Sequence, residues 1–167
     1  MTVTKDSLKG NARDAVTGVS TVADEARADH VFQGRYLTWP FEDAATAGTA
    51  YTETVIFQAV ASATTVKKAR VALPVTATAH AANGAVITIA KRTGAGGATT
   101  IASWSTLTAA QGTLTALIPG EMVLTVANVD MAAGDVLTLA ITKPSSGVAL
   151  TAATSKGNIT VLIEEGA

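Results

Sequence analysis

The sequence contains no cysteine and only two histidines. Disulfide bonds and thiolate-ligated metals are therefore excluded. The imidazoles of His30 and His80 are far apart in the sequence, and neither the His-Glu-x-x-His pattern nor the paired cysteines of zinc sites occur. We expect no metal site and no other cofactor.

Charge is scarce as well: 15% of the residues are charged, the formal net charge is -1 and the isoelectric point is about 6.1. Because no basic field is present, neither nucleic acid nor an anionic membrane is expected as a partner. The longest uncharged run, residues 93–120, contains the glycines and proline of strands and turns rather than the composition of a membrane-spanning helix. The first ten residues lack the apolar run of a secretory signal, so we expect synthesis in a cytoplasm.

Side chains that could form a catalytic site are also few. There is no Gly-x-Ser-x-Gly nucleophile motif, and the glycine-rich residues 94–97 precede another expected strand, which favours a hairpin loop over a phosphate site. Asp130 and Asp135 could suggest calcium, but two carboxylates around Gly134 are more typical of a turn. His80 is interpreted as a structural side chain beside a turn. We expect that the protein is not an enzyme.

Small and β-branched residues are abundant instead. Alanine and threonine make up over a third of the chain, and from residue 51 onward apolar and polar residues alternate. The clearest strand is 136–142, in which Leu137, Leu139 and Ile141 would face a core and Thr138 would face water or a partner. Further strands are predicted at 54–60, 66–73, 75–81, 85–91, 98–104, 113–118, 122–126 and 158–164.

Turn and edge signals refine this prediction. Asn83-Gly84 predicts a type I′ hairpin between 75–81 and 85–91. Pro74 indicates an edge, a bulge or a break. The basic cluster Lys67, Lys68 and Arg70 is interpreted as charge that protects an edge strand, with contact to an acidic partner as the second possibility. Since no helical period appears after residue 50, the predicted fold is all-β: an antiparallel, jelly-roll-like β-sandwich of about eight strands.

The N-terminal part differs in composition. Residues 1–43 carry 12 of the 25 charged side chains, and four of the seven aromatic residues fall within 31–41. A weak capping pattern at 21–24 allows one short helix that ends before Gly34. We therefore divide the chain into an N-terminal arm with an anchor segment, residues 1–50, and a sandwich domain, residues 51–167.

One stretch resembles a known family. Residues 118–142, with Ala-Gly-Asp-Val-Leu-Thr-Leu at 133–139, are followed by a glycine-containing loop at 143–157 and a closing strand at 158–164. This arrangement resembles the C-terminal half of the jelly-roll decoration, or cement, proteins of tailed-phage heads. Residues 75–79 and 89–100 are similar to its strand, glycine loop and strand, so the resemblance covers roughly residues 52–165.

The resemblance implies a homotrimer on the exterior of the virion, made in the host cytoplasm, with arms that bind neighbouring major capsid proteins. Contacts across capsomer seams would stabilise the assembled shell, and three linked arms would add avidity. The residues expected to bind this partner are three cations for charge-assisted pairs, Arg13, Arg27 and Arg35, and three aromatic anchors, Tyr36, Trp39 and Phe41.

Two alternatives stay open at this point. The clustered aromatics could instead cover the open end of their own sandwich. The whole protein could also be a head- or tail-fibre module that binds carbohydrate or a receptor on the host surface. Sugar sites usually expose aromatic rings, whereas two of the body's candidates, Phe57 and Trp104, fall in expected core strands, which disfavours this second function.

Overall fold

The computed structural model describes residues 34–42, 48–60, 63–94, 96–143 and 156–166. The predicted short helix, Arg13 and Arg27 lie outside the described residues. The division of the chain at residue 50 stays a prediction.

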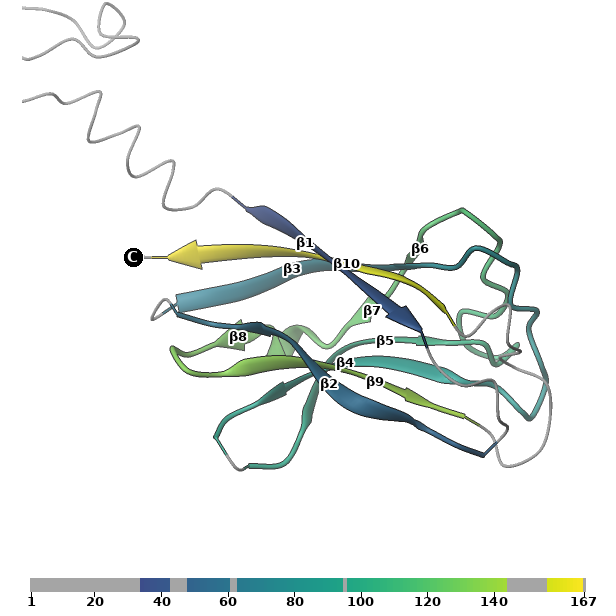
Figure 1. The fold of residues 1–167 in the computed structure, drawn as a ribbon, viewed down its shortest axis with the longest axis horizontal. Coiled ribbons are helices and arrows are strands. Elements are labelled where there is room, and N and C mark those ends of the chain that lie inside the picture. Colours follow the sequence, from purple (N-terminus) through teal and green to yellow (C-terminus); the bar gives the residue numbers. More distant parts are fainter. Residues whose placement is uncertain (1–33, 43–47, 61–62, 95, 144–155, 167) are drawn as a thin grey trace, which may run out of the picture.

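Two antiparallel sheets of five strands each face one another as the layers of a sandwich (Figure 1). The first sheet contains β1 (Arg35–Glu42), β10 (Lys156–Gly166), β3 (Ala63–Ala72), β6 (Gly120–Glu121) and β8 (Asp130–Met131). The second contains β2 (Tyr51–Gln58), β9 (Val136–Thr142), β4 (Val86–Arg92), β5 (Thr99–Ser105) and β7 (Val123–Leu124), and a short 3-10 helix, Val126–Asn128, follows β7.

The strand pairing is nested in the manner of a jelly roll. β1 pairs with β10, β2 with β9, β3 with β6 and β8, and β4 with β5, so that the first strand meets the last and the second meets the next to last. Seven strands have seven or more residues, and the two-residue strands are added at the edges: β6 and β8 pair with β3 in the first sheet, and β7 pairs with β5 in the second. The predicted fold class is therefore confirmed.

The core forms between the two layers as the alternation in β9 predicts. Leu137, Leu139 and Ile141 are fully buried, and they pack with inward residues of the other sheet such as Ile159 and Val161. Thr138 corrects the prediction, because it is buried rather than exposed. β9 lies between β2 and β4, and the side chain of Glu53 from β2 covers it.

The predicted type I′ hairpin at Asn83-Gly84 is wrong. β3 and β4 belong to different sheets, and neither Asn83 nor Gly84 has a positive φ. Glycine is needed at position 84 for space, since a Cβ there would lie 2.5 Å from Cγ of Leu107. The predicted strands 75–81 and 113–118 are likewise reduced to isolated bridges such as Ala77 with Leu114. The chain here crosses from one sheet to the other and cannot extend either one.

The predicted edge strand with the basic cluster is central instead. β3 pairs with β10 on one side and with β6 and β8 on the other. Lys67 lies 3.1 Å from Glu164, and Lys68 lies 3.0 Å from Glu121. The cluster therefore pairs with acidic side chains of its own sheet. Pro74 comes just after β3 ends, which confirms a break at that position.

Candidate attachment surface

The segment expected to anchor the protein forms β1, an edge strand of the sandwich. It pairs with β10 along its whole length, and among the described residues it has no strand partner on its other side. Alternate residues point to opposite faces. Those that face the second sheet lie opposite inward residues of β10; they are Arg35, Leu37, Trp39 and Phe41. Those on the outer face are Tyr36, Thr38, Pro40 and Glu42.

Phe41 belongs to the core and not to the exposed surface. Its side chain is 5% exposed, and it lies opposite Gly157 on β10. A Cβ at position 157 would come within 3.2 Å of the Phe41 ring and 2.3 Å of the Ala72 carbonyl oxygen, so glycine provides the space for the ring. Phe41 therefore covers its own sandwich, which is one of the two alternatives that the sequence left open.

Tyr36 and Trp39 are the two exposed aromatics of β1, at 64% and 39%. Arg35, beside them, is already engaged: its Nη2 lies 3.2 Å from Oε1 of Glu165, and its guanidinium carbon lies 5.4 Å from the centre of the Phe57 ring. A paired and stacked arginine contributes less charge to a partner than a free one. The structure thus brings together Arg35, Tyr36 and Trp39 of the predicted residues.

An apolar cavity of about 290 Å³ opens between the two sheets beside these aromatics. We call it the edge groove. Its walls come from β1 and β2, the outermost strands on this side of both sheets, and its floor from β9 and β10. The lining residues are Tyr36, Leu37, Thr38, Trp39, Ile56, Phe57, Leu137, Ile159 and Val161.

None of the side chains that line the edge groove is charged at neutral pH. Leu137, Ile159 and Val161 are core residues, so the edge groove leads directly to the hydrophobic interior. Uncharged apolar surface with exposed aromatics is typical of the central part of a protein–protein interface. The sequence indicated the β1 side of this surface. It did not indicate Ile56 and Phe57, because only the packing of the two sheets brings them to the same place.

The acidic side chains that the sequence singled out have structural contacts. No group of three or more His, Asp or Glu side chains that could hold a metal ion is found among them. Asp135 instead closes the turn at Gly134: its Oδ2 accepts a hydrogen bond from the Ala132 amide at 2.9 Å. Hydrogen bonds from the Thr93 side chain and from this amide lower the pKa of Asp135. The predicted turn is confirmed at Ala133-Gly134, whereas Asp130 belongs to β8.

His80 also has a structural contact. Its Nδ1 accepts hydrogen bonds from the backbone amides of Ala82, at 3.1 Å, and Asn83, at 2.8 Å. These bonds hold the loop that carries the chain between the sheets. The interpretation of His80 as a structural side chain beside a turn is therefore confirmed.

A polar cluster on the outer face of the second sheet escaped the sequence analysis. Arg92 donates from Nε to Oε1 of Glu53 at 2.7 Å and from Nη2 to Oε2, while the hydroxyl of Thr138 also donates to Oε1. The Arg92 hydrogen bonds, with that of Thr138, lower the pKa of Glu53 from 4.5 to about 2. No sequence signal links Glu53 to Arg92, because β9 separates their strands in the sheet.

This cluster predicts an acid-sensitive contribution to stability. The folded-state pKa of Glu53 lies below the unfolded value, so the contribution is complete above about pH 4.5 and is lost as the pH falls towards 2. Glu53→Gln should lower the free energy of unfolding by about 1–2 kcal/mol at pH 7, after allowance for partial exposure, and by much less at pH 2. Urea unfolding at both pH values measures this difference.

The control for this experiment is Glu121→Gln. Glu121 is 59% exposed and pairs with Lys68 across β6 and β3, so its substitution should change the free energy of unfolding by less than about 0.5 kcal/mol. Equal and small effects of the two substitutions at pH 7 would contradict the role assigned to the Glu53 cluster.

No helix in the described part of the chain is long and apolar enough to cross a membrane. No protein-family model matches the sequence, and no curated protein matches it either. Among solved structures, a chain from the structure of the infectious bursal disease virus Gx strain is similar at 17% identity and a TM-score of 0.38. The similarity covers 81% of this chain and 33% of that one. A likeness of this size assigns no function.

Proposed function

We propose that this chain is a non-enzymatic virion structural protein that decorates the exterior of a tailed-phage head. In this proposal it stabilises the head by binding across neighbouring major capsid proteins. The observation that carries the proposal is the edge groove, with Tyr36 and Trp39 exposed at its rim, placed directly after the N-terminal residues 1–33. The resemblance of residues 118–142 to phage decoration proteins supports the same class.

The edge groove suits an extended segment of a capsid subunit. β1 presents main-chain donors and acceptors along its free edge, so a partner strand can add to it, and alternate apolar side chains of that strand can enter the edge groove. Pro40 lacks a backbone N–H, so we expect a partner strand to pair only with the residues of β1 that precede Pro40. These are the residues that line the edge groove, so pairing and apolar contact coincide.

The stabilisation follows from linkage. A molecule that binds only where two capsid subunits meet adds its binding free energy to the assembled shell and none to the separated subunits. In a homotrimer, three such contacts act together, and a weak single contact becomes a strong attachment. The low net charge of the chain fits a partner reached by apolar contact rather than by electrostatic steering.

A second candidate function is carbohydrate binding by a head- or tail-fibre module. The observation in its favour is a hollow of about 120 Å³ on the outer face of the first sheet, where the exposed ring of Tyr36 lies beside Lys68, Arg70 and Thr160. Both cations already pair with Glu121, at 3.0 and 3.9 Å. Binding of the full chain to a glycan array would support this candidate in place of capsid decoration.

Heads that lack this protein are expected to release DNA at a lower temperature than heads to which it has been added back. The physical reason is the additional binding free energy of the assembled state. DNA release during a temperature ramp, followed with a fluorescent intercalating dye, measures the difference. The variant Val123→Ser serves as a matched control, because Val123 is exposed on β7 at the opposite edge of the second sheet and should protect heads as well as the native chain does. Identical release temperatures with and without the protein would contradict the proposal.

A further inference from the structure

Asn83 carries a carboxamide that the fold does not use. The chain contains four asparagines, at positions 11, 83, 128 and 158, and only Asn83 is followed by glycine. Asn83 and Gly84 are half-buried and lie outside any strand, in the segment that leads from β3 to β4. In the described part of the chain, no hydrogen bond involves the Asn83 side chain or the backbone amide of Gly84. Both groups are therefore available to each other.

The backbone on either side of this pair is held in place. The amide of Asn83 donates to Nδ1 of His80 at 2.8 Å. The amide of Ala85 donates to the Thr106 hydroxyl at 2.8 Å. The two anchored amides enclose Gly84, so any change in the length of the backbone between them acts on these two hydrogen bonds.

Packing requires a glycine directly after Asn83. A Cβ at position 84 would lie 2.5 Å from Cγ of Leu107, so no larger residue fits without a shift of its neighbours. Glycine also has the least hindered backbone amide, because it has no side chain beside the nitrogen. An amide nitrogen that follows asparagine can attack the side-chain carbonyl carbon and close a succinimide ring. The fold thus keeps an unhindered nucleophile next to an unused carboxamide.

We infer that Asn83 is a site of spontaneous deamidation, with the Gly84 amide nitrogen as the nucleophile and water as the co-reactant. This nitrogen bonds to the side-chain carbonyl carbon of Asn83, the bond from that carbon to the NH₂ group breaks, and ammonia leaves with the amide proton. Water then opens the succinimide at either carbonyl and gives aspartate or isoaspartate. The sum is a hydrolysis of the carboxamide, without oxidation or reduction. This inference does not depend on the proposed function.

The two products change the loop in different ways. Either product adds a carboxylate to residues 74–90, where His80 is the one titratable side chain. Isoaspartate also adds a methylene group to the backbone, between the anchored amides of residues 83 and 85. The longer backbone must displace one of these amides from its acceptor or move the glycine that packs against Leu107. We therefore expect the isoaspartate form to be less stable than the native chain.

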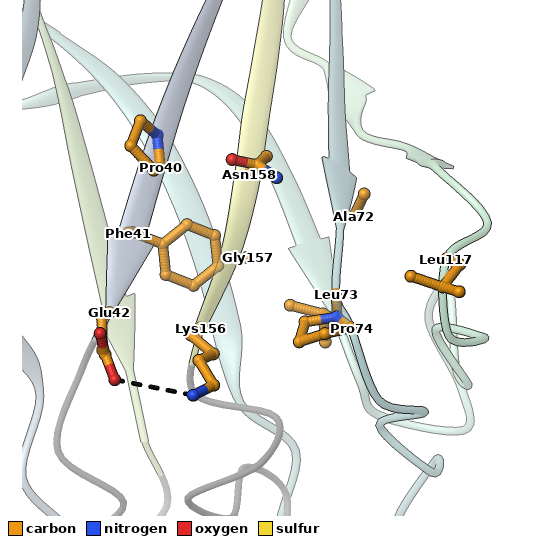
Figure 2. A pocket seen from close by; sticks show the side chains of 10 residues that line it. All are labelled: Pro40, Phe41, Glu42, Ala72, Leu73, Pro74, Leu117, Lys156, Gly157 and Asn158. Carbon is orange, nitrogen blue, oxygen red and sulfur yellow. Dashed lines mark ion pairs between the residues drawn. The ribbon is translucent and has the colours of Figure 1, made fainter.

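The other asparagines in the described part of the chain are protected and serve as internal controls. The side-chain amide of Asn128 donates to the Thr100 carbonyl oxygen at 2.9 Å. Asn158 lies on β10, which pairs with β1 on one side and with β3 on the other (Figure 2). Each of the two is followed by a β-branched residue, whose side chain crowds the backbone amide. We expect both to react slowly.

The test is peptide mapping by mass spectrometry of the full-length chain, aged at neutral and at mildly alkaline pH in water enriched with heavy oxygen. We expect Asn83 to convert at least about 10-fold faster than Asn128 or Asn158, with isoaspartate among the products. One heavy oxygen atom should enter at residue 83, and the rate should rise with pH because the attacking amide must lose its proton. Equal rates at the three asparagines would overturn the inference, as would conversion of Asn83 in urea but not in the folded chain.

Asn83→Gln is the matched control, because glutamine keeps a carboxamide but closes the corresponding larger ring much more slowly. Ageing should lower the melting temperature of the native chain and leave that of Asn83→Gln unchanged. Freshly purified Asn83→Asp contains the aspartate product without isoaspartate, so it should melt at a higher temperature than the aged native chain. If the Asn83→Gln chain loses as much stability on ageing as the native chain, the change lies elsewhere and the inference is wrong.

Discussion

Phe41→Ala is expected to lower the free energy of unfolding by about 3–5 kcal/mol, the usual range for loss of a buried phenylalanine ring. The neighbouring substitution Tyr36→Ala should change it by less than about 1 kcal/mol, since that ring is mostly exposed. Both residues lie on β1, so a general disturbance of the strand cannot explain a difference between them. Urea unfolding followed by circular dichroism measures both values.

The reason for the difference lies in the residues around each ring. Phe41 is 5% exposed and packs over Gly157, where the absence of a side chain provides its space. Its removal leaves a cavity that the stiff antiparallel pair of β1 and β10 cannot easily close. If Phe41→Ala and Tyr36→Ala proved equally mild, β1 would not be an integral strand of the sandwich, and the edge groove would lose one of its walls.

The strands that could be predicted are those whose alternation is local and complete. In β9, Leu137, Leu139 and Ile141 recur at every second position, and the predicted bounds, 136–142, agree with the structure. β1 has the same alternation through Leu37, Trp39 and Phe41, but the high charge of residues 1–43 and the cluster of aromatic residues were interpreted as an arm with an anchor segment. An edge strand tolerates proline because one of its sides has no ladder to complete.

Features that depend on the arrangement of the two sheets could not be predicted in this way. Asn83-Gly84 has the composition of a hairpin turn, yet the chain crosses between sheets there, and the close approach of Leu107 is what requires glycine. Thr138 occupies a position that alternation assigns to solvent. It is buried because Glu53 and Arg92, from strands on either side of β9, meet above it.

The candidate attachment surface could also be predicted only in part, because some of its residues depend on how the two sheets are arranged. The aromatic cluster at 31–41 indicated that Tyr36 and Trp39 are contact residues, and both are exposed beside the edge groove. The sequence did not show that Phe41 would point into the core, since that depends on the register of β1 against β10. It also did not show the second wall of the edge groove, because Ile56 and Phe57 belong to the other sheet.

The combined substitution of Tyr36→Ala and Trp39→Ala should weaken binding to heads at least about 100-fold, because the proposed interface would lose two aromatic anchors. The exposure of both side chains in the free protein means that the variant should still fold. Its melting temperature provides the check on folding. Val123→Ser, at the opposite edge of the second sheet, serves as the matched control for binding.

Co-sedimentation with heads that lack the protein is the most direct measurement of whether the edge groove attaches this chain to a capsid. The native chain and Val123→Ser should pellet with the heads and saturate a fixed number of sites, while the folded double variant should stay in the supernatant. A folded double variant that pellets at the same concentrations as the native chain would show that attachment occurs elsewhere on the molecule.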